Sequence, residues 1–259
     1  MGSDGRGDRR KTTATSLRVV DAIDELDGGR LTEISDQVGL STSTVYTHLE
    51  TLRDVGYVTK VGDTYQLGLK LFHLGEAARR RDERYDLAKE HAFELANATG
   101  EEVSFAVAEN GRSIVLFDEV SNPSVTGFQV GHQFYMHSSA SGKAMLAEFS
   151  DDRVHEILDR WGLPAQTPNT ITSRDELFAE LKRTRSRGYA VNDQEALEGL
   201  RSVALAITGP DGTAFGSLDI SGPPYRLPSD EKLVELLRPV VSELERELAN
   251  ENDATVRDS

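Results

Sequence analysis

The amino-acid sequence predicts an α+β protein with a small N-terminal helical module and a larger C-terminal domain built on a mixed, mainly antiparallel sheet. Three observations support this prediction. Apolar residues recur at helical spacing early in the chain, two short strand-like runs follow around a Gly-Asp pair, and the later chain alternates between strand and helix signals. With 259 residues the chain is long enough for two domains, each with its own core.

The segment from Leu31 to Tyr57 predicts two short helices joined by a tight turn. The first is marked by apolar residues and a terminating glycine, at Leu31, Ile34, Val38 and Gly39. The second has an apolar stripe at Val45, Leu49, Leu52 and Val55. Ser41 can cap this second helix, and its opposite face carries Thr42, Ser43, Tyr46, Thr47 and Glu50. Such a helix can enter the major groove of DNA, whereas an ordinary helical hairpin is the alternative.

Two strand-like runs follow, YVTKV at residues 57–61 and TYQL at residues 64–67, around the turn pair Gly62 and Asp63. Two helices and a two-stranded wing form a winged helix-turn-helix, which favours DNA binding. We expect this domain to cover residues 12–70, with a further helix from Thr15 or Ser16 to Leu26. Residues 1–11 are expected to be a flexible basic arm, which either contacts DNA or is a solvated tail.

The charge of the chain is unevenly distributed. Residues up to Arg84 contain 13 Lys and Arg against 14 Asp and Glu, whereas the remainder contains 16 against 30, which gives the net −15. The near-neutral part can approach DNA phosphates more easily. Only 7 of the 29 basic residues are Lys, a composition typical of salt-loving organisms, although an acidic mesophilic protein is the alternative. At molar salt the Debye length is about 3 Å, so recognition depends on short-range contacts to base edges.

Composition excludes or disfavours several functions. The absence of cysteine excludes disulfides, thiolate zinc sites and a cysteine nucleophile. No Walker or dinucleotide-binding motif is present, so we expect no metal or cofactor. Without an apolar signal segment or a run approaching the ~18 residues of a membrane helix, the protein is expected to be soluble and cytoplasmic. A hydrolase using the histidines and serines of residues 132–155 is disfavoured, because no G-x-S-x-G elbow accompanies them.

A linker helix is predicted over residues 71–86. Its apolar stripe lies at Leu69, Leu71, Phe72, Leu74 and Ala78, and the mixed-charge run from Ala78 to Asp86 is interpreted as a solvated face. A second domain is expected over residues 87–250, with a disordered tail at 251–259. Strands are expected at residues 103–108, 113–120, 125–130, 189–192, 202–208 and 214–221. Helices are expected at residues 86–99, 141–148, 151–160, 173–187 and 229–249.

Three segments of this second domain predict a ligand pocket. They are residues 140–142 at a helix start, residues 192–193 and 200–202 at strand ends, and residues 219–221 within a strand. The helix start offers free backbone N–H groups and the positive end of a dipole, which favour an anion. Asp219 and Ser221 alternate on their strand and therefore point to the same face. Asp193 and Glu195 are interpreted as solvated loop charges.

Several motifs in order resemble the IclR-type transcription regulators of bacteria and archaea. The motifs are LTEISDQVGLSTSTVYTHLETLRDVGYV with TYQLGLKLFHLG, MHSSASGKAMLA, RGYAVNDQEALEGLRSVALAI and FGSLDISGP. The resemblance extends from about Thr13 to Ala249. It implies a winged helix, a linker helix that pairs protomers, and a C-terminal effector domain with a GAF-like fold. By resemblance, a small-molecule effector contacts Ala140, Ser141, Asn192, Leu200, Ser202, Asp219 and Ser221.

The sequence departs from its relatives at both sites. Many members carry Arg where this chain has Thr47. This chain therefore lacks a side chain that could donate two hydrogen bonds to guanine at this position. His48 is interpreted as a packing residue, with a phosphate contact as the alternative. Some carboxylate-binding relatives have Ser at the position of Asp219. A buried Asp there repels a carboxylate and accepts hydrogen bonds from hydroxyls, which favours a sugar or sugar acid over a short keto acid. Local pairing of Asp219 is the alternative.

We therefore expect a dimeric or tetrameric regulator of carbon-source catabolism genes, controlled by an effector. Two winged helices would read a pseudopalindromic double-stranded operator through Ser41, Thr42, Ser43, Thr44, Tyr46, Thr47 and Lys60. The effector would shift the relative placement of the winged helices and so couple the two binding equilibria. The alternative is a ligand-sensing or partner-binding module without specific DNA binding, because the recognition helix is almost uncharged.

Overall fold

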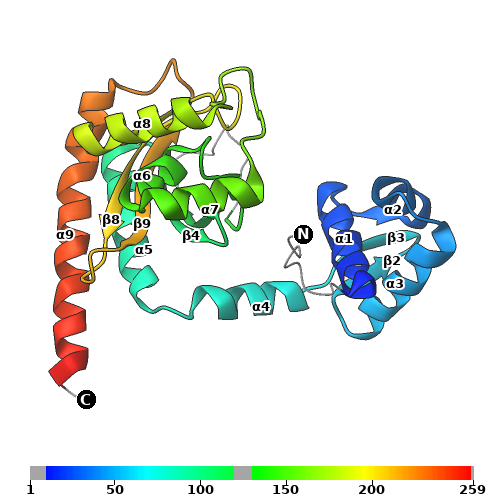
Figure 1. Cartoon of the computed structure of the whole chain (residues 1–259). Helices are drawn as coiled ribbons and strands as arrows, with labels where there is room; N and C mark the ends of the chain where they lie inside the picture. Colours follow the sequence, from blue (N-terminus) through cyan, green and yellow to red (C-terminus); the bar gives the residue numbers. More distant parts are fainter. Residues whose placement is uncertain (1–9, 120–129, 258–259) are drawn as a thin grey trace, which may run out of the picture. The chain divides into compact units, whose positions relative to one another are not determined.

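The computed structural model describes residues 10–119 and 130–257, with side chains up to Asn250 (Figure 1). The chain divides into two compact units between Arg81 and Asp82. Each unit is an independent packing arrangement with its own hydrophobic core.

The N-terminal unit is a winged helix-turn-helix. Its elements are α1 (Lys11–Glu25), β1 (Gly29–Arg30), α2 (Leu31–Val38), α3 (Thr42–Asp54), β2 (Val58–Val61), β3 (Thr64–Leu67) and α4 (Lys70–Arg79). The strands form an antiparallel sheet in the order β1-β3-β2. The two-residue strand β1 was not predicted, because it has no alternation of its own and is defined only by its pairing with Thr64 and Tyr65. The helix pair and the wing are confirmed.

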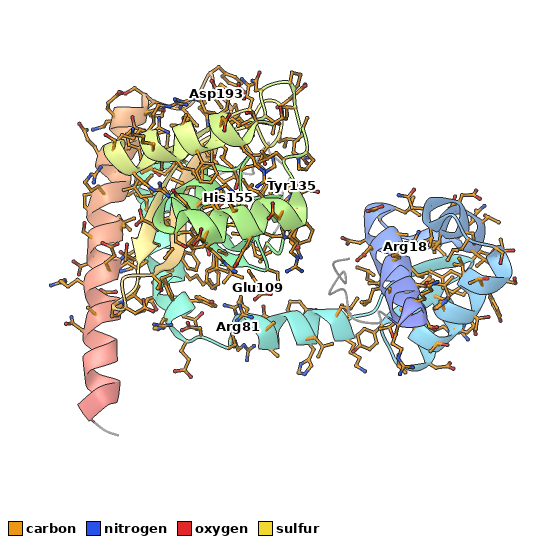
Figure 2. The ribbon with its side chains drawn as sticks, in the orientation of Figure 1. Arg18, Arg81, Glu109, Tyr135, His155 and Asp193 are labelled. Carbon is orange, nitrogen blue, oxygen red and sulfur yellow. The ribbon has the colours of Figure 1, made fainter. Side chains whose placement is uncertain are left out.

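Local sequence signals explain how this unit is held together. Gly39 ends α2 in the left-handed conformation, at φ 71°, and Ser41 caps α3. Tyr65 on the wing is almost fully buried against α1 and α3 residues such as Val19 and Leu49, so the wing is part of the core. Arg18 of α1, which is labelled in Figure 2, donates a 2.6 Å hydrogen bond to the backbone carbonyl of Val38. The core therefore fixes the position of α3.

The expected linker helix over residues 71–86 is wrong in its bounds. The segment forms two helices, α4, which ends at Arg79, and α5 (Arg84–Thr99). Asp82 interrupts the helical pattern, because its carboxylate accepts hydrogen bonds from the backbone N–H of Arg84 at 3.1 Å and from its guanidinium at 2.7 Å. Such a local bond competes with helical hydrogen bonding. The charged run is partly paired as expected, with Glu76 bonded to Arg79 and Arg80.

The C-terminal unit is an antiparallel sheet covered by helices. Besides α5 it contains β4 (Glu102–Glu109), β5 (Arg112–Glu119), β6 (Gln133–Tyr135), α6 (Ala140–Glu148), α7 (Asp151–Trp161), α8 (Arg174–Arg187), β7 (Ala190–Asp193), β8 (Arg201–Thr208), β9 (Ala214–Gly222) and α9 (Asp230–Arg257). The strand order is β6-β5-β4-β9-β8-β7, with every pair antiparallel. The α+β prediction is confirmed.

The two faces of this sheet differ in chemistry. Helices α5 and α9 cover a face of large apolar residues, among them Phe105, Val203 and Leu218 (Figure 1). Helix α6 covers the other face, where their strand neighbours Ser104 and Asp219 are small or polar. Alternation along each strand produces this division. The second face is therefore free to hold a ligand site.

Some predicted bounds differ from those observed. Helix α1 begins at Lys11, inside the expected flexible arm, and residues 1–9 lie outside the described residues. Of the expected strand at 125–130, residues 125–129 lie outside the described residues and Val130 is not in a strand. Helix α9 continues to Arg257, beyond its expected end at Ala249 and into the segment expected to be a disordered tail. The remaining helices and strands of the C-terminal unit match within two residues, except the unpredicted β6.

Candidate DNA-recognition helix and effector cavity

The N-terminus of α3 is organised by Ser41. Its hydroxyl accepts a hydrogen bond from the backbone N–H of Thr44 at 3.3 Å. The same oxygen lies 3.1 Å from the Ser43 hydroxyl and 2.8 Å from the Thr44 hydroxyl. Ser41 therefore satisfies a free N–H group of the helix and orients two neighbouring hydroxyls.

The exposed face of α3 is rich in hydroxyl groups and has no cation in its first two turns. Thr42, Ser43, Thr44, Tyr46 and Thr47 are all exposed. The Thr47 hydroxyl donates to the backbone carbonyl of Ser43 at 3.0 Å, and its lone pairs stay available as acceptors. The face can therefore offer hydrogen bonds and apolar contacts to base edges.

Three further residues of this unit, Arg53, His48 and Lys60, have defined surroundings. Arg53, the first cation along α3, is paired with Glu50 at 2.7 Å. Nδ1 of His48 lies 2.8 Å from the Ser16 hydroxyl on α1, which agrees with a packing role. Lys60 on the wing is exposed, with its ammonium 4.8 Å from the ring centroid of Tyr65. Lys60 is thus positioned on the surface as an exposed cation.

The seven residues expected to contact an effector line a single cavity, which we call the inner cavity. It lies between the polar face of the sheet and the start of α6 and has a volume of about 20 Å³. Its walls include Ala140 and Ser141 of α6, Asn192 of β7, Leu200 beside β8, Ser202 of β8, and Asp219 and Ser221 of β9. Further lining residues that sequence reasoning missed include Ser104, Ser113, Phe134 and Ala196. Segments from distant parts of the sequence therefore meet at this site.

Asp219 is the charged centre of the inner cavity. Its carboxylate accepts a 2.6 Å hydrogen bond from the Ser141 hydroxyl. Burial, together with the nearby Asp118 and Glu102, raises the pKa of Asp219 to about 7, while the bond from Ser141 opposes the shift. Burial likewise raises the pKa of Asp118 to about 6. Asp219 therefore holds a proton over part of the neutral range, and it can donate as well as accept hydrogen bonds.

Asn192 shapes the wall of the cavity. Its side-chain oxygen accepts hydrogen bonds from the backbone N–H groups of Glu195 at 2.8 Å and Ala196 at 3.3 Å. Its amide nitrogen lies 3.4 Å from the Ser202 hydroxyl and 3.5 Å from the carbonyl of Leu200. Asn192 thus holds the loop after β7 in place, and its amide has limited capacity for a ligand.

Two hydroxyls at the cavity have no hydrogen-bond partner. The Oγ atoms of Ser113 and Ser221 are both buried, and neither has a partner among the residues that the structure describes. A buried hydroxyl without a partner costs about 1–3 kcal/mol. A ligand hydroxyl that reached either atom would supply the missing hydrogen bond.

A buried ion pair supports the site and corrects one sequence interpretation. Glu195, expected to be a solvated loop charge, is buried and paired with Lys143 of α6. Burial lowers the pKa of Lys143 and raises that of Glu195, while their mutual attraction opposes both shifts. The loop after β7 is thereby tied to α6. The sequence signal for this ion pair was Lys143 itself, because it is a lysine among the small and apolar residues of α6.

The serines and histidines that could form a hydrolytic site have other roles. Nε2 of His137 lies 3.2 Å from the Pro164 carbonyl, and burial lowers its pKa to about 4. His155 lies on α7 (Figure 2), where its Nδ1 is 3.4 Å from Arg174. Ser139 caps α6 through the N–H of Gly142, and Ser141 donates to Asp219. His137, His155, Ser139 and Ser141 therefore each have a hydrogen-bond partner outside a serine–histidine pair.

Neither a membrane span nor a metal site is found in the described segments. Residues 10–119 and 130–257 contain no helix that is both long and apolar enough to span a membrane. Within the same ranges, histidine and acidic side chains nowhere form a group of three that could hold a metal ion.

Comparisons with known proteins match both units. Residues 14–62 match the IclR helix-turn-helix domain, and residues 83–246 match the bacterial transcriptional regulator IclR C-terminal domain. The probable HTH-type transcriptional regulator ArcR of Halobacterium salinarum is 31% identical over 235 residues, with 87% of this chain and 88% of that protein covered. This relative is haloarchaeal, which supports the interpretation of the composition as typical of a salt-loving organism.

Solved structures agree with this assignment. The IclR structure from Thermotoga maritima superimposes with a TM-score of 0.72 at 26% identity, covering 93% of this chain and 100% of that one. An IclR homologue from Microbacterium hydrocarbonoxydans, solved in complex with 4-hydroxybenzoate, has the same fold, with a TM-score of 0.73, 22% identity, and 92% and 99% coverage. The matched families and relatives are regulators and not enzymes. The chain belongs to the IclR family of DNA-binding transcriptional regulators.

Proposed function

We propose that this regulator binds its operator through uncharged contacts from α3 and responds to a hydroxyl-rich effector in the inner cavity. The effector would be a sugar or sugar acid, and the regulated genes would serve carbon-source catabolism. The observation that carries the proposal is the lining of the inner cavity, where serine hydroxyls surround Asp219 and no lysine or arginine of the described chain takes part.

The proposed operator contacts are the hydroxyl residues at the start of α3 and a wing cation, namely Ser41, Thr42, Ser43, Thr44, Tyr46, Thr47 and Lys60. Thr47 is the best single test, because it stands where relatives carry Arg. In molar KCl, where screening leaves mainly short-range contacts, we expect Thr47→Ala to weaken specific binding roughly tenfold. Thr51→Ala is the matched control, since Thr51 is also exposed and also bonded to the carbonyl four residues earlier.

Gel shift or fluorescence anisotropy with genomic fragments would measure the DNA affinities of wild type, Thr47→Ala and Thr51→Ala. Equal losses for the two variants would argue against base readout by Thr47. Failure of the wild-type protein to bind any specific fragment, with or without cell extract, would favour the sensor module without DNA binding.

We propose that the regulator acts as a homodimer or tetramer. Helix α4 has no buried residue, and its apolar side chains Phe72 and Leu74 are exposed together with Leu69 beside it. Exposed apolar surface of this kind favours pairing with another protomer. Sedimentation analysis would give the oligomeric state, and Phe72→Glu should shift it toward the monomer. An unchanged state would assign the pairing surface elsewhere.

Calorimetric titration tests the effector class. We expect sugars or sugar acids to bind and Asp219→Ser to weaken them, because the substitution removes the buried carboxyl. Ser217→Ala is the matched control, since Ser217 is buried on the same strand, β9, but does not line the inner cavity. Tight binding of glyoxylate or pyruvate that is unaffected by Asp219→Ser would contradict the proposal.

Coupling between the two sites would be reciprocal. The effector should change operator affinity by the same factor with which the operator changes effector affinity. Both factors can be measured at equilibrium by titrating one ligand at saturation of the other. Unequal factors would exclude a two-site scheme.

A further inference from the structure

A second cavity lies directly beside the inner cavity. This outer cavity is lined by Arg112, His132, Tyr135, Ser138, Gln166 and Leu197, among others. Phe134 and Ala196 line both cavities, so the two spaces are adjacent. Phe134 and Ala196 therefore form the boundary between the two cavities.

Arg112 is held in the wall of the outer cavity by its surroundings. The carbon of its guanidinium lies 3.6 Å from the ring centroid of Tyr135 and 5.2 Å from that of Trp161. Its Nη2 donates a 2.6 Å hydrogen bond to the carbonyl of Gln133, whereas its Nη1 has no partner among the described residues. Arg112 is thus a fixed cation with hydrogen-bonding capacity left unused.

The two cavities have opposite charge. The inner cavity carries the carboxyl of Asp219 and no cation, whereas the outer one carries Arg112 and no carboxyl group, as judged from the described lining residues. Burial and the nearby Arg112 lower the pKa of His132, which is therefore neutral at pH 7. An anionic group is attracted by Arg112, and it is repelled by Asp219 when that carboxyl is ionised. A molecule with hydroxyls at one end and an anion at the other fits this polarity.

We propose that the outer cavity is the anion subsite of the effector, in which Arg112 binds a carboxylate or phosphate while the hydroxyls of the same molecule occupy the inner cavity. This inference rests on the proposed function and narrows the effector from a sugar or sugar acid to a hydroxyl-rich acid whose anion contacts Arg112. Arginine suits this role, because its guanidinium donates several directed hydrogen bonds to an oxyanion. Arg112 is then the residue that distinguishes the acid from its neutral counterpart.

The test compares matched ligands on the full-length protein. Gluconate, galactonate and arabinonate, the corresponding sugar phosphates, and the neutral sorbitol, galactitol and arabinitol are titrated by calorimetry against wild type and Arg112→Gln. We expect at least one acid to bind wild type roughly 10- to 100-fold more tightly than its neutral partner, as a charge-assisted hydrogen bond allows. Arg112→Gln should abolish this preference and leave neutral binding unchanged. The carboxylate and phosphate arms distinguish the two anions.

Arg160→Gln is the matched control. It removes a cation that also lies 5.2 Å from the Trp161 ring but is exposed on α7. It should retain the preference for the acid. Arg112→Lys keeps the charge and should retain part of the preference, and thermal melting shows whether each variant folds.

The outcomes separate the two levels of the proposal. An acid preference that persists in a folded Arg112→Gln variant, or neutral ligands that bind wild type as tightly as the acids, would overturn the anion subsite alone. Binding of no hydroxyl-rich probe to wild type would overturn the proposed effector class together with it.

Discussion

The two faces of the six-stranded sheet are made by the same strands yet serve different purposes. Phe105 and Ser104 are neighbours on β4, and both are almost completely buried, but one packs among aromatic rings and the other bonds to Asp118 at 2.8 Å. The apolar face supplies the stability of the unit, and the polar face keeps unsatisfied groups for a ligand. Burial alone therefore does not distinguish a core residue from a site residue, whereas the chemistry of the groups that the residue contacts does.

The largest effect is expected from the apolar face. Phe105 lies 5.8–6.2 Å from the ring centroids of Tyr85, Phe117 and Phe215. Phe105→Ala should lower the free energy of unfolding by about 3–5 kcal/mol, because it leaves a cavity in this cluster. Ser104→Ala is the control on the opposite face and should cost about 1 kcal/mol. Urea denaturation measures both changes. Equal losses would contradict the view that the apolar face contributes more to stability than the polar face.

A slightly smaller effect on stability is expected from the buried ion pair between Lys143 and Glu195. Lys143→Met should destabilise the protein by about 3 kcal/mol, because Glu195 is left buried without its partner. Adding Glu195→Gln should restore part of that loss, since the uncompensated charge is removed. Chemical denaturation of the single and double variants gives the coupling. Additive losses would mean that the ion pair does not secure the loop.

Asp219 should make the polar face sensitive to pH. Its pKa is about 7 in the folded protein, against an ordinary value of 3.8 for an exposed aspartate, so between these values the folded state holds a proton that the unfolded state releases. Stability therefore falls as pH rises from about 4 to 7, and Asp118 contributes in the same direction.

The free energy of unfolding of the wild type should fall by roughly 1–3 kcal/mol between pH 5 and pH 8, and Asp219→Asn should abolish this fall. Unfolding free energies measured at several pH values test this. A wild-type slope that survives the substitution would assign the dependence to other groups.

The smallest effects on stability are expected from the unpartnered serines. Ser113→Ala and Ser221→Ala should each raise the free energy of unfolding by about 1 kcal/mol, because each removes a buried hydroxyl that has no partner among the described residues. Each should weaken a hydroxyl-rich effector roughly tenfold. Ser217→Ala is the matched control, since Ser217 is equally buried and unpartnered but does not line the inner cavity. A loss of binding in this control would indicate an indirect effect.

Local sequence signals predicted most of the fold because they act over few residues. The stripe of α3, the cap at Ser41 and the hairpin turn at Gly62 and Asp63 are readable from spacing alone. Strands β1 and β6 were missed because they are short and depend on pairing partners. The break at Asp82 was missed because one side-chain hydrogen bond overrides a continuous helical pattern.

The candidate site was predictable only where family motifs covered it. All seven expected effector residues line the inner cavity, but whether they contact an effector remains a prediction. The roles of Lys143, Glu195 and Arg112 were not identified, because they depend on partners elsewhere in the chain. Lys143 and Glu195 are separated by 52 positions, and no periodicity links them.

Trp161 is the only tryptophan in the chain, and it lies beside Arg112. Its indole N–H donates a 2.6 Å hydrogen bond to the carbonyl of Asn110, so the ring has a fixed orientation. Indole emission responds to the electric field across the ring, and an anion that neutralises the adjacent guanidinium changes that field. The protein therefore contains a built-in optical reporter. Unlabelled samples could be screened against metabolite libraries by fluorescence, with emission wavelength as the readout.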